Sequence, residues 1–283
     1  MYARSWGSEQ IQPDSGASLE VSETGTVALL TDFGADDPFV GIMKGVIRRM
    51  APGAEIIDLC HGVPSYSVSH GAAILSSSYR YFPAGTLHVA IVDPGVGSSR
   101  RVLYARAGGF GFLAPDNGIL SYVFSREAPE QLISIEEREY FLPMVSSTFH
   151  GRDIFAPVAA HLINGLEPGR LGPAVDGMVR LPEPYVREGP DFIEGEVSGI
   201  DKFGNLITTI DAGLLRGRKI KRITLKDCII SDLSSSYSEG EEGTAIALID
   251  SLDRLEVAVS RGNAAKKLNG RILDRVIVEY GEA

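Results

Sequence analysis

The sequence predicts an α/β protein with an N-terminal α/β domain, built on a central, mostly parallel sheet, and a smaller C-terminal all-β, barrel-like domain. From Thr26, short apolar runs rich in β-branched residues alternate with longer stretches of helical spacing, which is typical of repeated βα units. The prolines between Leu181 and Pro190 can continue neither a helix nor a central strand. After Asp191, short strand patterns follow one another, which indicates a separate all-β domain.

Each element of the N-terminal domain is predicted from its own pattern. Apolar runs predict strands at Val27–Thr31, Ile56–Leu59 and Leu87–Val92. Apolar residues at three- and four-residue intervals predict helices at Phe39–Met50, Ser69–Tyr81 and Ile154–Asn164. The continuous apolar character of the third strand indicates burial on both faces, so we expect helices on both sides of the sheet.

The domain limits follow from these patterns. The α/β domain is predicted over residues 26–185 and the β-barrel domain over 191–283, with the linker at the proline-bearing segment. Strands of the second domain are predicted at Glu194–Ile200, Leu206–Ile210, Thr244–Ile249, Leu255–Val259 and Ile272–Tyr280. Residues 1–25 are polar and contain no apolar run of the kind found in a secretory signal, so they are predicted to form a flexible N-terminal extension.

Composition excludes several classes of function. The 283 residues include 27 Lys and Arg against 37 Asp and Glu, and the net charge of −10 disfavours nucleic-acid binding. The one dense basic run is predicted to be the solvated face of a strand; it comprises Arg216, Arg218, Lys219, Lys221 and Arg222. No segment has the length and apolarity of a membrane span. Two cysteines, Cys60 and Cys228, cannot form a disulfide framework, so a cytoplasmic location is expected.

Three loops that follow predicted strands carry polar residues and begin at Asp32, His61 and Asp93. Ligands bind beyond the carboxyl ends of strands in open α/β sheets, so these loops are candidates for a binding site. A Pro-Gly-Val-Gly turn joins Asp93 to Arg100 and allows the carboxylate and the guanidinium to meet. Taken alone, such a pair is better explained as an ion pair within a loop.

Two more segments hold candidate residues. His150 lies just before a predicted helix, whose N-terminus disfavours a charged imidazole, although a capping histidine would look the same. The tight turn that carries Asp201, Phe203 and Asn205 suits recognition of adenine or an amino acid, and it is equally compatible with an ordinary β-turn. The other histidines have no comparable context and are expected to be structural or on the surface; they are His61, His70, His88 and His161.

Five motifs, taken together and in order, decide between these explanations. They are Thr31-Asp32-Phe33-Gly34, Cys60-His61-Gly62, Val92-Asp93-Pro94-Gly95-Val96-Gly97, Phe149-His150-Gly151-Arg152-Asp153 and Asp201-Lys202-Phe203-Gly204-Asn205. This set resembles the S-adenosylmethionine (SAM) hydroxide adenosyltransferase family, relatives of the fluorinating and chlorinating enzymes that use the same substrate. The resemblance extends from about Thr26 to the C-terminus.

The resemblance implies that water or hydroxide attacks the 5′ carbon of SAM and releases adenosine and methionine. By position, Asp93, Arg100 and His150 match the family's water-holding residues, and Asp32 matches the acid that holds the ribose hydroxyls. The other substrate-binding positions matched in this way are Tyr66, Phe149, Asp201, Phe203, Asn205, Ser251, Asn263 and Ala264. Leu252-Asp253-Arg254 departs from the halogenase pattern.

The resemblance also implies a homotrimer, with SAM bound between the N-terminal domain of one subunit and the C-terminal domain of the next. By the same resemblance, no metal and no cofactor beyond the substrate are expected. The sulfonium leaves as a neutral thioether, so no general acid is needed to protonate it. The barrier then lies in aligning an oxygen nucleophile with the 5′ carbon. Either Asp93 or His150 can accept the proton of the water, and the sequence leaves this choice open.

Two other functions are compatible with the sequence. The first is a SAM-dependent halogenase on the same scaffold, which Asp93 disfavours because a carboxylate near an incoming halide repels it. The second is a non-catalytic module that binds SAM or adenosine. The three functions differ in what SAM becomes. A hydrolase forms adenosine, a halogenase forms a 5′-halogenated nucleoside, and a binding module leaves SAM unchanged.

Overall fold

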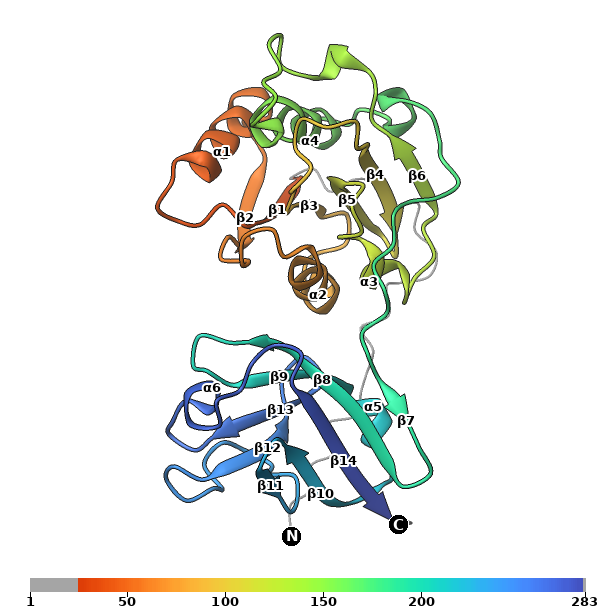
Figure 1. Ribbon diagram of the computed structural model, residues 1–283. Coiled ribbons are helices and arrows are strands. Elements are labelled where there is room, and N and C mark those ends of the chain that lie inside the picture. The colour runs from red at the N-terminus through yellow and green to blue at the C-terminus, as the bar shows by residue number, and fades with distance from the viewer. Residues whose placement is uncertain (1–24, 282–283) are drawn as a thin grey trace. The chain divides into compact units, whose positions relative to one another are not determined.

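The computed structural model describes residues 25–281, which fold into two compact units that divide between Leu181 and Pro182 (Figure 1). The N-terminal extension predicted for residues 1–25 lies outside the described residues, except for Gly25. The first unit is α/β and the second is almost entirely β, which confirms the predicted fold class.

The first unit is built on a six-stranded sheet with the strand order β2-β1-β3-β5-β4-β6. Its strands are β1 (Thr26–Thr31), β2 (Glu55–Cys60), β3 (Leu87–Ile91), β4 (Val102–Ala107), β5 (Phe110–Pro115) and β6 (Gln131–Ser134). The first four in this order pair in parallel, whereas β4 pairs antiparallel with both of its neighbours. The carboxyl ends of β1, β2 and β3 therefore meet at one edge of the sheet.

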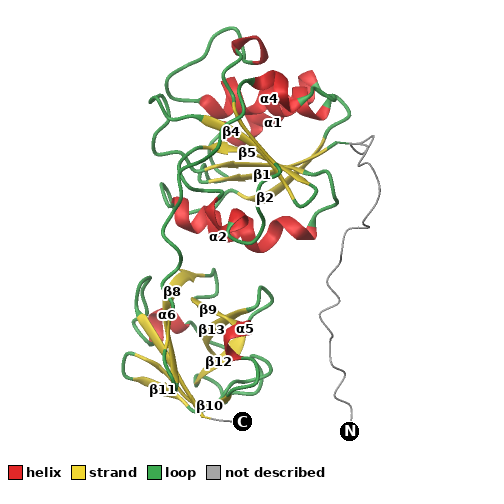
Figure 2. Ribbon diagram, turned by 90° about the vertical axis from the view of Figure 1, so that its right-hand side faces the viewer, coloured by secondary structure: helices red, strands yellow, loops and turns green. Residues whose placement is uncertain are grey.

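Helices cover both faces of this sheet, as Figure 2 shows. The α-helices of the unit are α1 (Phe39–Met50), α2 (Val68–Ser78), α3 (Ser121–Phe124) and α4 (Ala156–Ile163). Helices α1 and α4 pack on one face and α2 and α3 on the other, giving two hydrophobic cores separated by the sheet. Every residue of β1 and β3 is buried, and for β3 this confirms the burial on both faces that its continuous apolar run predicts.

Local irregularities distinguish the observed elements from the predicted ones. The predicted helix at Ser69–Tyr81 ends as an α-helix at Ser78 and finishes in the 3₁₀ turn Tyr79–Tyr81. A π-helical turn, Gly151–Phe155, precedes α4, so the predicted helix at Ile154–Asn164 starts inside a wider turn. Short 3₁₀ turns also occur at Arg138–Tyr140 and Pro168–Leu171.

The second unit is an antiparallel sheet with the order β11-β10-β14-β8-β9-β13-β12. Its strands are β7 (Arg187–Glu188), which pairs with β8, then β8 (Phe192–Ile200), β9 (Leu206–Asp211), β10 (Lys219–Leu225), β11 (Cys228–Ile230), β12 (Ala245–Ile249), β13 (Arg254–Val259) and β14 (Arg275–Gly281). A bridge between Leu233 and Ala247 brings the end strands β11 and β12 together, so the sheet is nearly closed around one core. The short helices α5 (Ala212–Leu215) and α6 (Ala264–Lys267) lie in its connections.

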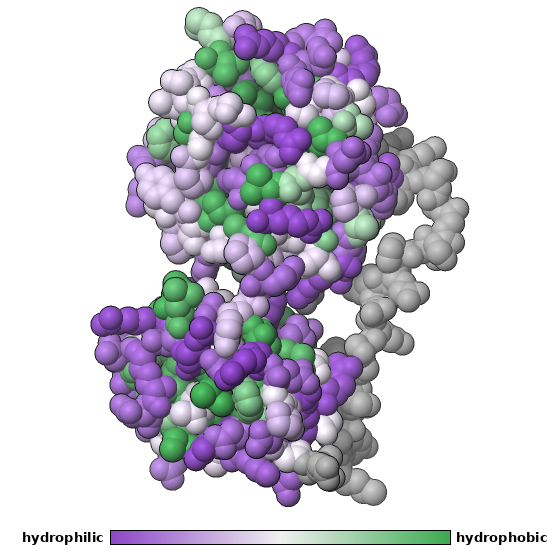
Figure 3. All heavy atoms as spheres, turned by 45° about the vertical axis from the view of Figure 1, so that its right-hand side comes forward, coloured by the Kyte–Doolittle hydropathy of each residue, from purple (hydrophilic) through white to green (hydrophobic). Residues whose placement is uncertain are grey.

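The surface is consistent with the charge pattern of the sequence. In the basic run, Lys219, Lys221 and Arg222 are exposed on β10, which confirms the predicted solvated strand face. On the face drawn in Figure 3, hydrophilic and hydrophobic residues are intermixed in both units. Among residues 25–281, no helix is long and apolar enough to cross a membrane.

A buried histidine on β3 makes the first unit sensitive to acid. His88 is packed among the rings of Tyr79, Phe82, Phe110 and Phe112, and neither ring nitrogen makes a well-formed hydrogen bond within the described residues. Burial lowers the pKa of His88 from 6.5 to about 4. The neutral ring is therefore part of the folded core, whereas the ring of the unfolded chain takes up a proton near pH 6.5.

We expect His88→Leu to remove part of the loss of stability in acid. Because the pKa of His88 is depressed in the folded state, its contribution to the free energy of unfolding is complete above pH 6.5 and is lost as the pH falls toward 4. The pKa difference corresponds to about 3 kcal/mol in this free energy. Urea unfolding at pH 7 and pH 4.5 measures the change. His161→Leu, at a histidine of α4 whose ring lies edge-on to Tyr140, controls for the replacement of a histidine as such. If His88→Leu and the wild type lose the same stability between the two pH values, the prediction is contradicted.

Candidate active site

Loops at the carboxyl edge of the first sheet carry most of the candidate residues of the first unit, and the others, Phe149 and His150, lie in the segment before α4. Asp32 directly follows β1, and the loop from His61 follows β2. Asp93 comes two residues after the end of β3, which lies beside β1. Because these strands are parallel and neighbouring, the sheet places the start of all three loops at one edge, where ligands bind in this class of fold.

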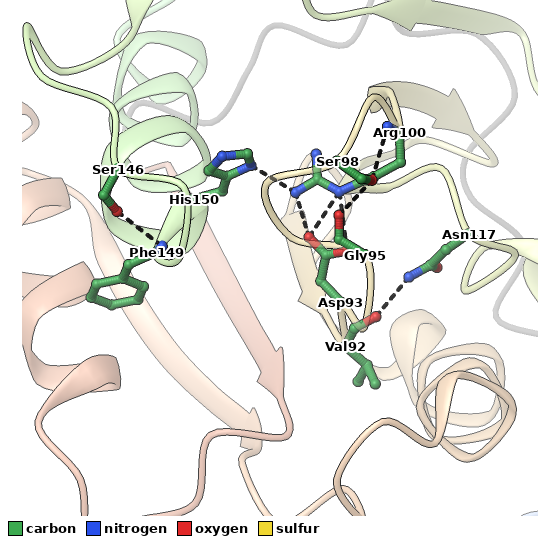
Figure 4. Close-up of polar contacts among 9 residues, drawn as sticks. All are labelled: Val92, Asp93, Gly95, Ser98, Arg100, Asn117, Ser146, Phe149 and His150. Carbon is green, nitrogen blue, oxygen red and sulfur yellow. Dashed lines mark hydrogen bonds and ion pairs between the residues drawn. The ribbon is translucent and has the colours of Figure 1, made fainter.

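Asp93, Arg100 and His150 form a contiguous trio (Figure 4). The Nε of Arg100 donates to both carboxylate oxygens of Asp93, at 3.0 and 2.8 Å, and Nη2 also contacts Oδ2. The same Nη2 lies 2.9 Å from Nδ1 of His150. The side chains of Asp93 and Arg100 are only 5% and 10% exposed, so this charge-assisted pair is held largely out of water.

Two close contacts allow the trio to form across 50 residues of sequence. Gly97 has a φ of 79°, and a Cβ at this position would lie 2.2 Å from the carbonyl oxygen of Ser147. Only glycine therefore lets the loop after β3 approach the segment that precedes His150. Within that segment, the Oγ of Ser146 accepts from the backbone N–H of Phe149 at 3.0 Å and fixes the entry into the π-helical turn.

The contacts of His150 define which ring nitrogen carries hydrogen. Burial, together with the nearby Arg100 guanidinium, lowers the pKa of His150 below 6.5, so the ring is neutral at neutral pH. Arginine has only donors, so Nδ1 must accept from Arg100 and Nε2 must carry the hydrogen. In this arrangement His150 presents a donor at Nε2, and Asp93 supplies the negative charge of the trio.

Asp32 and Tyr66 are also brought together. The backbone N–H of Tyr66 donates to Oδ2 of Asp32 at 2.9 Å. Tyr66 has a φ of 67°, in the left-handed region that non-glycine residues seldom adopt, and its side chain is 73% exposed. Backbone strain of this kind is concentrated at functional sites, and here it leaves an aromatic ring accessible beside a carboxylate.

Phe149 belongs to an aromatic cluster of the first unit. Its ring lies edge-on to Phe39, with centroids 5.1 Å apart, and to Phe33, at 6.1 Å. The Arg152 guanidinium lies 5.3 Å from the Phe149 centroid. The ring therefore packs beside the Asp32 loop and the start of α1, and it remains half-buried.

In the second unit, the side-chain carboxylate of Asp201 holds the turn from Asp201 to Asn205 together through hydrogen bonds. Oδ1 of Asp201 accepts from the backbone N–H groups of Phe203 and Asn205, at 2.9 and 2.8 Å, and Oδ2 accepts from the Asn205 amide at 3.0 Å. These bonds bury Asn205 and leave the Phe203 ring 63% exposed. The turn can thus offer an aromatic face and a carboxylate to a ligand.

The segment around α6 lies against this turn. Gly204 has a φ of 88°, and a Cβ there would overlap the Asn263 side chain at 2.1 Å. The Asn263 side chain accepts from the backbone N–H of Lys266 and caps α6, while Ala264 is fully buried. Ser251 lies in an exposed turn between β12 and β13.

Two groups that sequence reasoning passed over are now apparent. Glu256 is buried on β13 and accepts from the Tyr237 hydroxyl at 2.9 Å; burial, assisted by Asp201 and Asp250, raises its pKa to about 7. An acid within the apolar run of β13 was the available signal. His61, expected to be structural or on the surface, belongs to a hydrogen-bonded chain next to Asp32. Within residues 25–281, no cluster of His, Cys, Asp or Glu could hold a metal ion.

Comparison with known proteins gives consistent matches over both units. The family model of the SAM hydroxide adenosyltransferase N-terminal domain matches residues 27–172, and the C-terminal domain model matches residues 195–277. The chain is 37% identical over 257 residues to the (R)-S-adenosyl-L-methionine hydrolase of Thermus thermophilus, covering 86% of this chain and 94% of the relative. It is 27% identical over 295 residues to the fluorinase of Nocardia brasiliensis, covering 90% of this chain and 97% of the relative. A solved structure of an uncharacterized conserved protein from Thermotoga maritima matches with a TM-score of 0.84 and 33% identity, covering 89% of this chain and 99% of the other.

Proposed function

The chain belongs to the SAM hydroxide adenosyltransferase family, and from this we infer that it hydrolyses S-adenosyl-L-methionine to adenosine and L-methionine. The observation that carries the mechanism is the buried Asp93–Arg100–His150 trio, which combines one negative charge with one imidazole donor. The relatives are named for the R configuration at sulfur. We propose that this chain also prefers the R epimer.

The reaction is a substitution at the 5′ carbon. An oxygen of water forms a bond to this carbon while the bond to sulfur breaks, and sulfur keeps the electron pair and leaves as the neutral thioether of methionine. The water loses one proton, and its oxygen becomes the 5′-hydroxyl of adenosine. No redox step occurs and the leaving group needs no protonation, so we propose that no metal and no cofactor beyond SAM takes part.

We propose that the three residues of the trio have different roles. Asp93 accepts the proton of the attacking water, because it is the only anionic group of the trio. Arg100 holds the carboxylate through two donors and fixes its orientation. The Nε2–H of His150 donates to the water and aims a lone pair at the 5′ carbon. The proton transfer typically contributes about a hundred- to ten-thousand-fold in rate.

The remaining residues are proposed to bind the substrate. Asp32 faces the ribose diol and Tyr66 packs against the sugar, a proposal that their contact at one sheet edge supports. Phe149 would line the same region. The second-unit residues would contact the methionine and adenine portions; they are Asp201, Phe203, Asn205, Ser251, Asn263 and Ala264.

Isotope labelling tests the reaction directly. In H₂¹⁸O, adenosine should carry one ¹⁸O in its 5′-hydroxyl, in amounts equal to the methionine released. Added chloride or fluoride should leave the product unchanged. A 5′-halogenated nucleoside would identify a halogenase, and SAM that stays intact during prolonged incubation would identify a binding module. With a mixture of sulfur epimers, the R epimer should disappear first.

The neutral state of His150 predicts an acid limb in the rate profile. Its pKa lies below 6.5, so protonation of His150 should not affect kcat near neutral pH, and kcat should fall as the pH drops through the lowered pKa. Protonation would place a second cation beside Arg100 and remove the Nδ1 acceptor. Profiles of kcat from pH 5 to 8 for the wild type and His150→Gln measure this; the variant should be slower and should lack the limb. An identical limb in the variant would assign it to another group.

We propose a homotrimer whose sites combine the first unit of one subunit with the second unit of the next. Neither an Asp93→Asn variant nor an Asp201→Ala/Asn205→Ala variant should be active alone. After subunit exchange between them in equal amounts, random assembly would rebuild about a quarter of the sites, and activity should return to about that fraction. Verified exchange without recovery, or a monomer by sedimentation, would contradict the proposal.

A cytoplasmic location is proposed for the same chain. Cys60 and Cys228 are both free thiols, which suits a reducing compartment. Fractionation of cells that express the natural protein would test the location.

A further inference from the structure

A chain of four side chains runs from the surface of the first unit to the end of β1. The Nζ of Lys44 donates to Oδ2 of Asp58 at 2.5 Å, and Oδ1 of Asp58 lies 2.9 Å from Nε2 of His61. Nδ1 of His61 in turn lies 2.9 Å from the hydroxyl of Thr31. The chain thus connects α1, β2, the loop after β2 and β1, and it ends at the residue directly before Asp32.

Exposure is lowest at the inner end of this chain. Lys44 and Asp58 are 34% and 44% exposed, whereas His61 is 12% exposed and Thr31 is fully buried. Burial works to raise the pKa of the Asp58 carboxyl, but the hydrogen bonds from His61 and Lys44 outweigh it and hold the pKa below the usual value. Asp58 is therefore a fixed negative charge that orients the imidazole of His61.

The hydrogens of the chain have one consistent direction. The backbone N–H of Phe33 donates to the Thr31 hydroxyl at 3.2 Å, so this hydroxyl is free to donate its own hydrogen to Nδ1 of His61. Nε2 of His61 then carries the hydrogen that Asp58 accepts. Every donor and acceptor is matched when His61 is neutral in this tautomer.

These bonds hold the backbone on both sides of Asp32. Before Asp32, the Thr31 hydroxyl is locked by His61 and receives the N–H of Phe33. After Asp32, the backbone N–H of Gly34 donates to the carbonyl oxygen of His61 at 2.8 Å. The same loop after β2 reaches Asp32 itself through the N–H of Tyr66. His61 thus fixes the segment that carries the carboxylate, although it does not contact that carboxylate.

We propose that His61 is a positioning residue for ribose recognition, acting through Thr31 and anchored by Asp58 and Lys44, so that the Asp32 carboxylate is held ready for the 2′- and 3′-hydroxyls. This inference rests on the proposed role of Asp32 in binding the ribose. It assigns the hydrogen-bonded chain to substrate selectivity, because an orientation error at Asp32 would weaken only those ligands that carry the diol.

Two nucleosides separate positioning from general structural support. Adenosine carries the diol, and 2′,3′-dideoxyadenosine does not. Calorimetry on the full chain should show that the wild type prefers adenosine. His61→Ala and Thr31→Val should each weaken adenosine binding by about tenfold and leave the affinity for dideoxyadenosine unchanged. Asp58→Ala changes a more exposed position and should give the same pattern with a smaller effect. This variant provides the test if the two buried variants fold poorly.

Thr26→Val is the matched control for Thr31→Val. Thr26 lies at the opposite end of β1, and its hydroxyl also bonds a side chain, Glu55, at 3.3 Å. This control should bind both nucleosides as the wild type does. The proposal is overturned if the chain variants weaken both ligands equally or neither of them. A wild type that does not distinguish the two nucleosides would instead remove the ribose role of Asp32, and the proposal with it.

Discussion

Asp93→Asn is expected to lower kcat by about a hundred- to ten-thousand-fold, the range typical for loss of a positioned proton acceptor. The amide cannot take a proton from water, and its NH₂ group would oppose the donors of Arg100 that now hold the carboxylate. In the proposed mechanism Asp93 acts on the water and not on adenosine or methionine, so the affinities for these two products should change little. Single-turnover kinetics at saturating SAM, with calorimetry on adenosine, measures the two effects separately.

The chain offers a matched control for this variant. Asp116 is also nearly fully buried and receives two donors from one guanidinium, Nε and Nη2 of Arg101, at 2.9 and 2.6 Å. Asp116→Asn should therefore show the cost of disturbing a buried ion pair while keeping turnover. His150→Ala should lower kcat as Asp93→Asn does. Wild-type turnover in either trio variant would remove that residue from the reaction.

Asp32→Ala is expected to weaken adenosine binding by about a hundredfold or more. A carboxylate that faces two vicinal hydroxyls makes two charge-assisted hydrogen bonds, each worth about 1.5–3 kcal/mol at the upper range. Turnover at saturating SAM should fall far less than affinity. Calorimetric titration with adenosine measures the loss.

Two companion variants make this result specific. Asp32→Asn keeps an acceptor for the backbone N–H of Tyr66, so it separates loss of charge from disturbance of the loop. Asp36→Ala, at an exposed acid of the same loop, should bind adenosine normally. If Asp32→Ala retains wild-type affinity, the ribose must be held elsewhere.

The alternation of short apolar runs with stretches of helical spacing was enough to predict the α/β architecture of the first unit and the positions of β1, β2 and β3. The strands β4, β5 and β6 were not predicted, because β4 pairs antiparallel with both β5 and β6 and this arrangement interrupts the repeated βα pattern. The π-helical turn before α4 was also missed. Its apolar spacing resembles that of an α-helix, and the wider winding depends on packing rather than on composition.

Residue patterns alone joined site residues only where one short segment carried the signal, whereas His150 was placed with Asp93 and Arg100 through the resemblance of the ordered motifs. Asp93 and Arg100 share a loop of eight residues, and the structure joins them. His61 gave no such signal, because its partner Thr31 lies 30 residues earlier and meets it only through the pairing of β1 with β2. Glu256 gave one local signal, an acid within the apolar run of β13, but the acids that act on it come from separate turns. Partners that meet through strand pairing cannot be identified from local sequence patterns alone.

The π-helical turn at Gly151–Phe155 also has a consequence for how this site can be altered. An α-helix advances about 100° around its axis per residue. The π-helical turn contains an extra residue, so it rotates the preceding residues about the helix axis relative to the positions that a continuous α-helix would give them. The imidazole of His150 faces Arg100 in that rotated position. Copying the histidine onto an uninterrupted helix of another scaffold would point the ring in a different direction, so a transplanted site would have to include the insertion as well as the side chains.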